Sequence, residues 1–298
     1  MAPSMPTTSV RRRSTSLIAA AAVIGLGLAG CTTTDTDDDS SLLQTLQDRG
    51  SVTVGFAGEA PYSFMEDGEL TGATVALHRE IFGNLGIETV EGVNADFGAL
   101  IPGLQANRFD VVSAGMSILP ERCEQAAFSE PEFNYTTALM VEEGNPLELT
   151  DMQSVAESGA RLATMTGAIE SDYASELGID SMQVATPQDG MDAITSGRAD
   201  VFALTGISLN WMANNNPDAP VEVTQSFVAE INGVPQVGAG GTVFRTDDQE
   251  LLDAYNEELA EITSDPERYL SIVGEFGFTE EELPDPELTT ADLCAGVE

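Results

Sequence analysis

One pattern occurs twice in this sequence: a helical segment ends, an Arg-x-Asp turn follows, and a β-rich strand begins. The first copy contains Arg108 and Asp110, and the second contains Arg198 and Asp200, 90 residues further along the chain. A pattern that returns in this way indicates two units with the same internal order. We expect both arginines to serve the turn rather than a ligand. The repeat therefore predicts two similar lobes.

Strands and helices alternate around the two copies. Period-two alternation and β-branched residues predict strands at 51–56, 88–93, 109–112, 161–165, 200–204 and 237–245. Apolar residues at helical spacing predict helices at 74–85, 98–106, 191–196 and 248–262. This alternation predicts an α/β fold in which each lobe has a mostly parallel sheet flanked by helices. The glycines of 237–245 lack the lysine and the spacing of a phosphate-binding loop.

The N-terminus has the features of an export signal. Three arginines at 11–13 precede an apolar run at 17–28 that is too short to span a bilayer comfortably. Residues 28–31 read L-A-G-C and resemble a bacterial lipobox, in which Cys31 is acylated and becomes the mature N-terminus. The alternative is a secreted protein without a lipid anchor, and the export route is left open between the general and twin-arginine systems. Residues 31–46 are then expected to form an acidic, solvated tether.

The charge balance excludes several classes of function. After removal of residues 1–30, 8 arginines stand against 50 acidic residues, a net charge of −42. Such a chain repels nucleic-acid phosphate and anionic lipid. A hydrophobic share of 42% still allows a large core. The absence of lysine and the excess of acid resemble proteins of salt-adapted organisms.

Few residues are available for metal or nucleophilic chemistry. Cys123 and Cys294 form an even pair in an oxidising compartment, which favours a disulfide over two buried thiols. Together with His78 they are too few for a standard zinc site, so no metal is expected. His78 falls within the predicted helix at 74–85, and we expect it at the surface rather than as a general base.

Four segments, in the same order, resemble the solute-binding proteins of polar amino-acid ABC importers. They are 55–64 (GFAGEAPYSF), 96–104 (DFGALIPGL), 114–122 (AGMSILPER) and 241–245 (GTVFR). The resemblance implies a two-lobed type II periplasmic-binding-protein fold, with lobe one at 47–140 plus 237–298 and lobe two at 141–236. It also implies a monomeric binding protein without a cofactor, not an enzyme, held on the extracytoplasmic face of the cell membrane. Its partners would be ABC permease and ATPase subunits.

Within this family the sequence is similar to the ectoine- and hydroxyectoine-binding lipoproteins of actinobacterial type. The similarity rests on residues 59–62, 96–102, 120–125, 202–209, 276–279 and 293–294. Ectoine is a cyclic amidinium that carries a carboxylate, so its binder needs one group for the anion and another for the cation. The alternative ligand in the same class is a polar or cationic amino acid.

The resemblance assigns the anion site to Arg122. This residue matches the family arginine that holds the ligand carboxylate, which a planar guanidinium can do bidentately. Backbone N–H groups of Gly167 and Ala168, in a loop that opens a helix, could meet the same carboxylate. The competing interpretation of Arg122 is a surface ion pair.

The cation site is assigned to two aromatic residues and one acid. Tyr62 and Phe97 match aromatic positions of the family pocket, where ring faces attract delocalised positive charge. Glu59 is then the partner of the amidinium N–H groups. The competing interpretations are lobe packing for the aromatic residues and a solvated loop acid for Glu59. Phe64 could belong to the wall or to the core.

Two departures from the family pattern point to different ligands. Amino-acid binders usually place an aspartate at the position of Thr205, and threonine cannot neutralise a buried ammonium group. Ser117 stands where ectoine binders carry a third aromatic residue. The missing charge outweighs the missing ring, so ectoine or hydroxyectoine is the predicted ligand. A dehydratase-like enzyme, with Glu59 or Glu170 as general acid, is the interpretation from another class.

Overall fold

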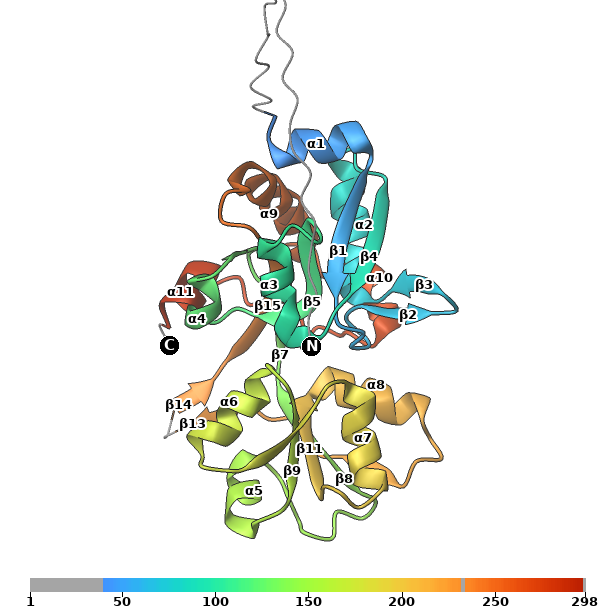
Figure 1. Ribbon diagram of the computed structural model, residues 1–298, viewed down its shortest axis with the longest axis vertical. Coiled ribbons are helices and arrows are strands. Elements are labelled where there is room, and N and C mark those ends of the chain that lie inside the picture. Colours follow the sequence, from blue (N-terminus) through green and yellow to red (C-terminus); the bar gives the residue numbers. More distant parts are fainter. Residues whose placement is uncertain (1–39, 232–233, 297–298) are drawn as a thin grey trace, which may run out of the picture. The chain divides into compact units, whose positions relative to one another are not determined.

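The computed structural model describes residues 40–231 and 234–296. The predicted signal, Cys31 and all but the last part of the expected tether lie outside the described residues. The described chain forms two lobes, each built on one β-sheet with helices on both faces (Figure 1). Among the described residues, none of the helices is both long and apolar enough to cross a membrane.

The two sheets repeat one arrangement. The first has six strands in the order β4-β1-β5-β15-β6, with β7 paired to β15, and the second has five in the order β10-β9-β11-β8-β12. The bounds in the first sheet are β1 Ser51–Phe56, β4 Thr89–Asn94, β5 Val111–Ser117, β6 Ala127–Phe128, β7 Phe133–Tyr135 and β15 Gly238–Phe244. The bounds in the second are β8 Thr137–Glu142, β9 Leu162–Met165, β10 Ser181–Val184, β11 Val201–Thr205 and β12 Val221–Val223.

The parallel strands are β4-β1-β5 in the first sheet and β10-β9-β11 in the second. The other strands are antiparallel, so the sheets are more mixed than the mostly parallel sheets that the sequence predicted. The reason is that β15 and β8 each enter from the other lobe and pair antiparallel with β5 and β11. Two hairpins lie outside these sheets: β2 Phe64–Glu66 with β3 Glu69–Thr71, and β13 Ala229–Ile231 with β14 Val234–Gln236. The α/β fold class with two lobes is confirmed.

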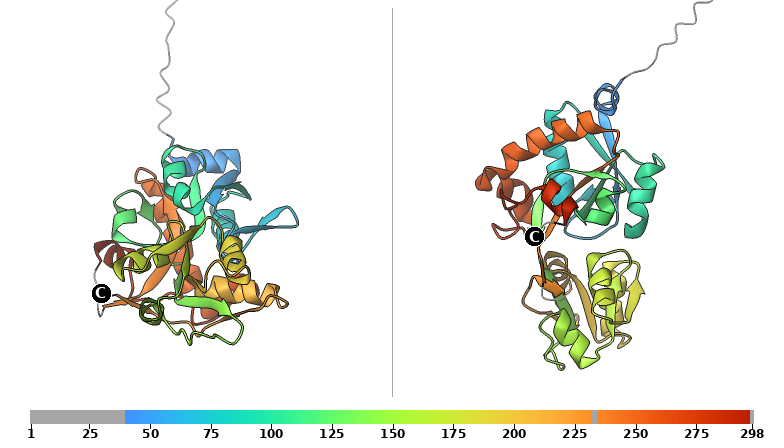
Figure 2. Two further views of the ribbon diagram at one scale, coloured as in Figure 1. Left: turned by 60° about the horizontal axis from the view of Figure 1, so that its bottom comes forward. Right: turned by 90° about the vertical axis from the view of Figure 1, so that its left-hand side faces the viewer.

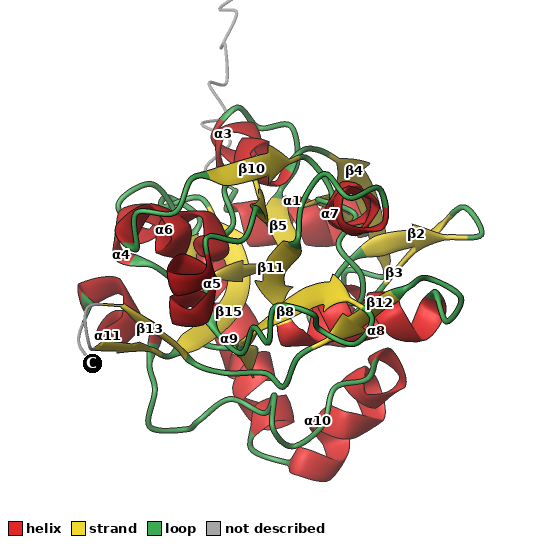
Figure 3. Cartoon of the chain, turned by 90° about the horizontal axis from the view of Figure 1, so that it is seen from below, coloured by secondary structure: helices red, strands yellow, loops and turns green. Residues whose placement is uncertain are grey.

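Helices cover both faces because neighbouring strand residues point in opposite directions. Val111 packs in the cluster that contains α2 (Ala73–Asn84), whereas Val112 packs with α3 (Leu100–Gln105). In the second lobe, α5 (Met152–Ser158) and α6 (Ile169–Glu176) lie on one side of β11, and α7 (Pro187–Thr195) lies on the other (Figure 3). The remaining long helices are α8 Gly206–Asn215, α9 Gln249–Thr263 and α10 Pro266–Val273, of which α9 and α10 pack on α2 (Figure 2).

Several predicted boundaries differ from the structure, and three of them bear on the site or on the division into lobes. The predicted strand at 109–112 continues to Ser117, which brings that residue to the end of β5. The expected tether to residue 46 is wrong at its end, because Ser41 caps α1 (Leu42–Arg49) and Leu46 is completely buried. Strand β8 begins at Thr137, so the second sheet starts four residues before the expected start of lobe two at 141.

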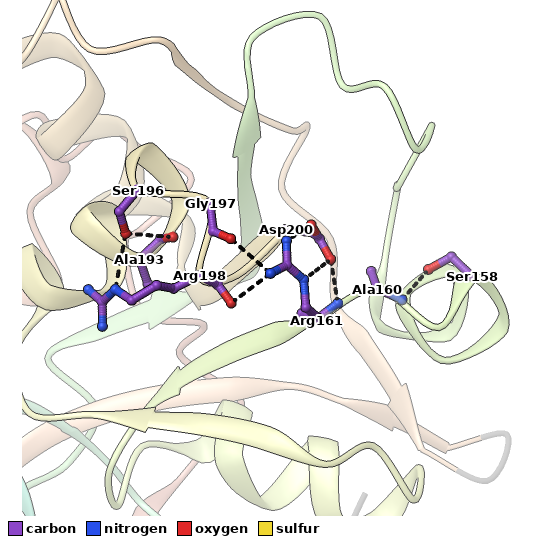
Figure 4. Close-up of polar contacts among 8 residues, drawn as sticks. All are labelled: Ser158, Ala160, Arg161, Ala193, Ser196, Gly197, Arg198 and Asp200. Carbon is purple, nitrogen blue, oxygen red and sulfur yellow. Dashed lines mark hydrogen bonds and ion pairs between the residues drawn. The ribbon is translucent and has the colours of Figure 1, made fainter.

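The repeated Arg-x-Asp pattern has the same structural role in both lobes. Asp110 accepts a hydrogen bond from Thr53 N at 2.8 Å and pairs with the guanidinium of Arg49. Asp200 accepts from the backbone N–H of Arg161 at 2.8 Å and pairs with its guanidinium at 2.5 Å (Figure 4). Each aspartate therefore connects the start of its own strand to the start of the neighbouring parallel strand. Arg198 donates to Ser196 Oγ within the turn, as expected of a turn residue.

The predicted surface position of His78 is wrong. Its side chain is completely buried on α2, and its Nε2 lies 2.6 Å from Thr242 Oγ1. The periodicity of α2 indicated a single apolar face, but α9 and α10 cover a second face of this helix. Burial lowers the pKa of His78 to about 3, so the imidazole is neutral and serves the core. Thr242 also bonds to the buried carboxylate of Glu132, which holds β15 in this network.

The predicted disulfide is present. Cys123 at the end of α4 (Pro120–Cys123) is bonded to Cys294 in α11 (Thr290–Ala295), with the two Cα atoms 5.6 Å apart. The bridge connects positions separated by 171 residues and therefore ties the C-terminal helix to the lobe that carries Arg122.

Replacement of both bridged cysteines by serine should lower the free energy of unfolding by about 2–5 kcal/mol, because the cross-link restricts a long loop of the unfolded chain. Urea unfolding of wild type, of reduced wild type and of the Cys123→Ser/Cys294→Ser variant measures this effect. Reduced wild type should match the variant. Two free thiols in the intact mass of native, unreduced protein would refute the bridge.

Candidate ligand-binding site

Glu59 connects the two lobes. It follows β1 in the first lobe, is 4% exposed, and its Oε1 accepts a hydrogen bond from Ser208 Oγ at 2.7 Å. Ser208 in turn accepts from Thr205 Oγ1 at 3.0 Å, and both hydroxyls lie at the start of α8 in the second lobe. Burial raises the pKa of Glu59 to about 7, although the Ser208 hydroxyl acts in the opposite direction. The interpretation of Glu59 as a solvated loop acid is therefore wrong.

Arg122 makes the corresponding connection on the other side of the site. It lies in α4 and is 8% exposed, so it is not part of a surface ion pair. Its Nη1 donates to the carbonyl of Ser117 at 3.0 Å, and its Nη2 donates to the carbonyl of Gly167 in the second lobe at 2.9 Å. A surface pocket of about 290 Å³ is lined in part by Arg122, Phe97 and Gly167. A buried guanidinium that is held by two carbonyls can still bind a carboxylate with its remaining N–H groups.

The two predicted aromatic residues have different surroundings. The guanidinium carbon of Arg122 lies 5.6 Å from the centre of the Phe97 ring, within the range of a cation–π contact. Tyr62 packs against Phe133, with ring centres 5.1 Å apart, so part of its role is lobe packing. Gly115 has a φ of +58°, and a Cβ there would lie 2.6 Å from the Tyr62 ring, so only glycine lets the ring approach this strand.

Glu170 is a second buried acid that the binding scheme from the sequence did not include. It is the second residue of α6 and 1% exposed, and neither carboxylate oxygen has a hydrogen-bond partner among the described residues. Burial raises its pKa to about 8, and the charge of Glu59 acts in the same direction. Its own backbone N–H, the charge of Arg122 and the Thr137 hydroxyl oppose this shift. The hydroxyls of Tyr62 and Tyr135 are also buried and without a partner in the described chain. We call Glu59, Tyr62, Arg122, Tyr135 and Glu170 the interlobe cluster.

The remaining predicted residues surround this cluster. Ser117 and Thr205 are 7% and 8% exposed, and each contributes through the bonds described above. Gly167 offers its carbonyl to Arg122, and the N–H of Ala168 already donates to the carbonyl of Met165, so Ala168 is not free to meet an anion through that group. Phe64 contacts Trp211 at 5.8 Å between ring centres and belongs to the packing. In the described ranges no group of three or more His, Cys, Asp or Glu side chains is placed to hold a metal ion.

Three members of the site were missed as ligand-binding candidates: Ser208, Glu170 and Tyr135. Ser208 lies one helical turn after Thr205, and this spacing could have marked it as a second hydroxyl on the same face. Glu170 was considered only as the general acid of an enzyme. Its place in the first turn of a helix, three residues after Gly167, was the available signal. No local pattern indicates that its carboxylate is buried.

The buried acids should make the free protein less stable as the pH rises. Both folded-state pKa values, about 7 for Glu59 and about 8 for Glu170, exceed the ordinary value of 4.5, so stability is highest at low pH and falls as the pH rises through these values. Between pH 5 and 8, the stability of the Glu59→Gln/Glu170→Gln variant relative to wild type should increase by roughly 3–6 kcal/mol. Urea unfolding at both pH values measures the difference. Equal pH dependence in the two proteins would mean that both carboxyls are solvated in the free protein.

The chain passes twice between its two α/β lobes. Groups of opposite charge and aromatic rings are buried between these lobes. This arrangement is typical of a protein that encloses a small polar ligand. The chain belongs to the bacterial extracellular solute-binding proteins, family 3, whose model matches residues 52–271. It is therefore a solute-binding protein of an ABC transporter of the amino-acid type.

Three relatives illustrate the range of ligands. The chain is 34% identical over 261 residues to a probable amino-acid ABC transporter periplasmic-binding protein of Sinorhizobium fredii, covering 85% of this chain and 86% of that protein. It is 32% identical to EhuB, whose crystal structure is a complex with hydroxyectoine, with a TM-score of 0.75 and coverage of 85% and 97%. It is 28% identical to an ancestral arginine-binding protein bound to arginine, with a TM-score of 0.66 and coverage of 76% and 98%.

Proposed function

We propose that this protein is a lipid-anchored, extracytoplasmic receptor that captures ectoine or hydroxyectoine for an ABC permease and its ATPase. The observation that carries the proposal is the arrangement of Arg122, Glu59 and Thr205. Arg122 binds the ligand carboxylate, and Glu59 pairs with the amidinium. Thr205 supplies no charge for an α-ammonium group. The similarity to EhuB supports this ligand class.

The aromatic residues fit the same ligand. A flat, delocalised cation is attracted to the face of an aromatic ring, and Phe97 and Tyr62 are both buried at the site. Acylation of Cys31 would anchor the protein, and the acidic surface would suit a salt-adapted organism that collects compatible solutes. The Sinorhizobium fredii relative is a probable ABC transporter binding protein, and we propose no catalytic step.

A polar or cationic amino acid is the second candidate. Ser117 is the residue that amino-acid binders usually have at its position, and Glu170 supplies a second buried acid that a basic side chain could use. The arginine-bound relative supports this alternative.

A thermal-shift screen followed by calorimetry distinguishes the two candidates, because a ligand that binds only the folded state raises the melting temperature. The panel consists of ectoine, hydroxyectoine, arginine, glutamine and histidine. Ectoine or hydroxyectoine should bind at least tenfold more tightly than any of the amino acids. Tight binding of an amino acid without binding of ectoine would contradict the proposal.

Thr205→Asp should change the preference of the site toward α-amino acids. The new carboxylate can pair with an α-ammonium group, so the ratio of amino-acid affinity to ectoine affinity should rise by about tenfold or more. Calorimetry with ectoine and arginine gives both affinities. Thr205→Val is the control, since it removes the hydroxyl without adding a charge, and it should leave the ratio close to that of wild type. An unchanged ratio in Thr205→Asp would show that the ammonium site lies elsewhere.

A further inference from the structure

Glu170 has no role in the binding scheme above, although it is the least exposed acid of the interlobe cluster. We propose that Glu170 contacts the ligand as a neutral carboxylic acid and thereby selects a ligand with one cationic group over a ligand with two. The inference rests on the proposed function, in which the ligand carries one carboxylate and one amidinium. It identifies Glu170 as a further specificity residue and makes ligand binding depend on the proton that this residue carries.

Glu170 interacts electrostatically with residues of the predicted ligand site, most of which do not belong to its own lobe. The titratable and charged groups with which it interacts electrostatically are Glu59, Arg122, Tyr62, Tyr135 and Tyr173. Four of these five belong to the first lobe or to the crossing strand β7, whereas Glu170 belongs to the second lobe. The strands packed on α6 add nothing further: β9 and β10 have no ionisable residue, and Glu230 of β13 is exposed. Both carboxylate oxygens of Glu170 are buried without a partner in the described chain.

The charges in the cluster balance only when one proton is present. Burial raises the pKa of each tyrosine above its ordinary value, so Glu59, Glu170 and Arg122 determine the charge within the cluster. Asp172 also interacts with Arg122, but it is exposed to solvent, which screens its charge. With both acids ionised the cluster has one uncompensated negative charge, and with one acid protonated it is neutral. An uncompensated charge in a desolvated site is strongly unfavourable. The closed site therefore keeps one proton unless the ligand brings an additional positive charge.

Hydrogen bonding decides which acid keeps that proton. Donors stabilise an ionised carboxylate, and Glu59 accepts from Ser208, which itself accepts from Thr205. No donor makes a hydrogen bond of this kind to Glu170 among the described residues. Its own N–H and the Thr137 hydroxyl lower its pKa by less than burial raises it, so its neutral form is favoured. Glu59 is then the anion that pairs with the ligand cation, and the O–H of Glu170 donates to an oxygen of the ligand.

This arrangement distinguishes ligands by their net charge. A zwitterion such as ectoine, with one amidinium and one carboxylate, is neutral and matches the neutral, singly protonated cluster. A ligand such as arginine, with two cations and one carboxylate, matches the cluster only after Glu170 has lost its proton. Binding of the zwitterion should therefore weaken when Glu170 ionises.

The test is the affinity for ectoine, measured by calorimetry from pH 7.5 to 9.5. Few other groups titrate in this range, because the chain has no lysine and Cys123 and Cys294 are bridged. With the pKa of Glu170 at about 8, wild-type affinity should fall by about 25-fold over this range. Binding at pH 9 should take up about 0.9 proton per ligand, measured in two buffers of different ionisation enthalpy. The number of protons taken up on binding is measured on wild type alone, so it tests the role of Glu170 even if a variant fails to fold.

Glu170→Gln keeps the size and a hydrogen-bond donor but cannot ionise. It should bind ectoine at pH 7.5 within about threefold of wild type, with an affinity that no longer changes with pH. The control is Glu176→Gln, the same substitution at an exposed position of α6, which should keep the wild-type profile.

Four outcomes would overturn the inference. One is a flat wild-type profile, and another is a slope that persists in Glu170→Gln. The third is loss of ectoine binding by folded Glu170→Gln at pH 7.5, and the fourth is tight arginine binding by wild type that Glu170→Gln abolishes. If wild type binds neither ectoine nor hydroxyectoine at pH 7.5, the proposed function fails and this inference fails with it. Binding at pH 7.5 with a flat profile contradicts the inference alone.

Discussion

Replacement of Arg122 by alanine should weaken ectoine binding by about 2–5 kcal/mol, which corresponds to roughly 30- to 3000-fold in affinity. The ligand carboxylate would then be desolvated without its partner. Arg122 also donates to Gly167 across the two lobes, so the variant loses a contact that favours closure. Both effects act in the same direction. Calorimetry measures the loss.

Arg198→Ala is the matched control for this variant. Arg198 is exposed and donates to Ser196 within its turn, so its removal should leave ectoine affinity within about twofold of wild type. Thermal unfolding of both variants shows whether they remain folded. If folded Arg122→Ala binds ectoine as wild type does, the carboxylate is held elsewhere and the proposed site is misplaced.

Glu59→Gln should weaken ectoine binding by about 2–3 kcal/mol, or roughly 30- to 150-fold. Glutamine can still accept a hydrogen bond from Ser208, so the loss reports the charge rather than the connection between the lobes. The effect should be smaller than that of Arg122→Ala because Glu170 can compensate. Without the charge of Glu59 the pKa of Glu170 falls, and Glu170 can then ionise beside the ligand cation.

Calorimetry on Glu59→Gln at two pH values tests this compensation. The variant should recover part of its affinity between pH 6 and 8, as Glu170 ionises. Glu66→Gln, at an exposed position of β2, is the control and should behave as wild type. Ectoine binding by Glu59→Gln that equals wild type at both pH values would show that Glu59 is not the partner of the amidinium.

The order of strands and helices could be predicted because it depends on local periodicity. The strand at 51–56 was predicted with its observed bounds, and the helix at 248–262 was displaced by one residue. The repeat around Asp110 and Asp200 indicated two similar units, which the two sheets confirm. The even cysteine pair indicated the disulfide between Cys123 and Cys294.

For the binding site, the resemblance selected residues that the fold then brings together. Glu59, Tyr62 and Arg122 all belong to the interlobe cluster, and Phe97 lies beside the guanidinium of Arg122. These positions could be selected in advance because each lies in a short family motif. A motif preserves residue identity along the chain, but it does not contain the partners that approach from the other lobe.

The tertiary structure alone decided which polar groups are buried and what they contact. His78 looked like a surface residue because periodicity describes one helix at a time, whereas α9 and α10 cover its second face. The contact between Ser208 and Glu59 joins residues 149 positions apart, and no local spacing can indicate such a pair. Glu170 is an ordinary first-turn acid in the sequence. In the folded chain both of its carboxylate oxygens are buried without a hydrogen-bond partner among the described residues, and the free energy of a charge depends on what surrounds it.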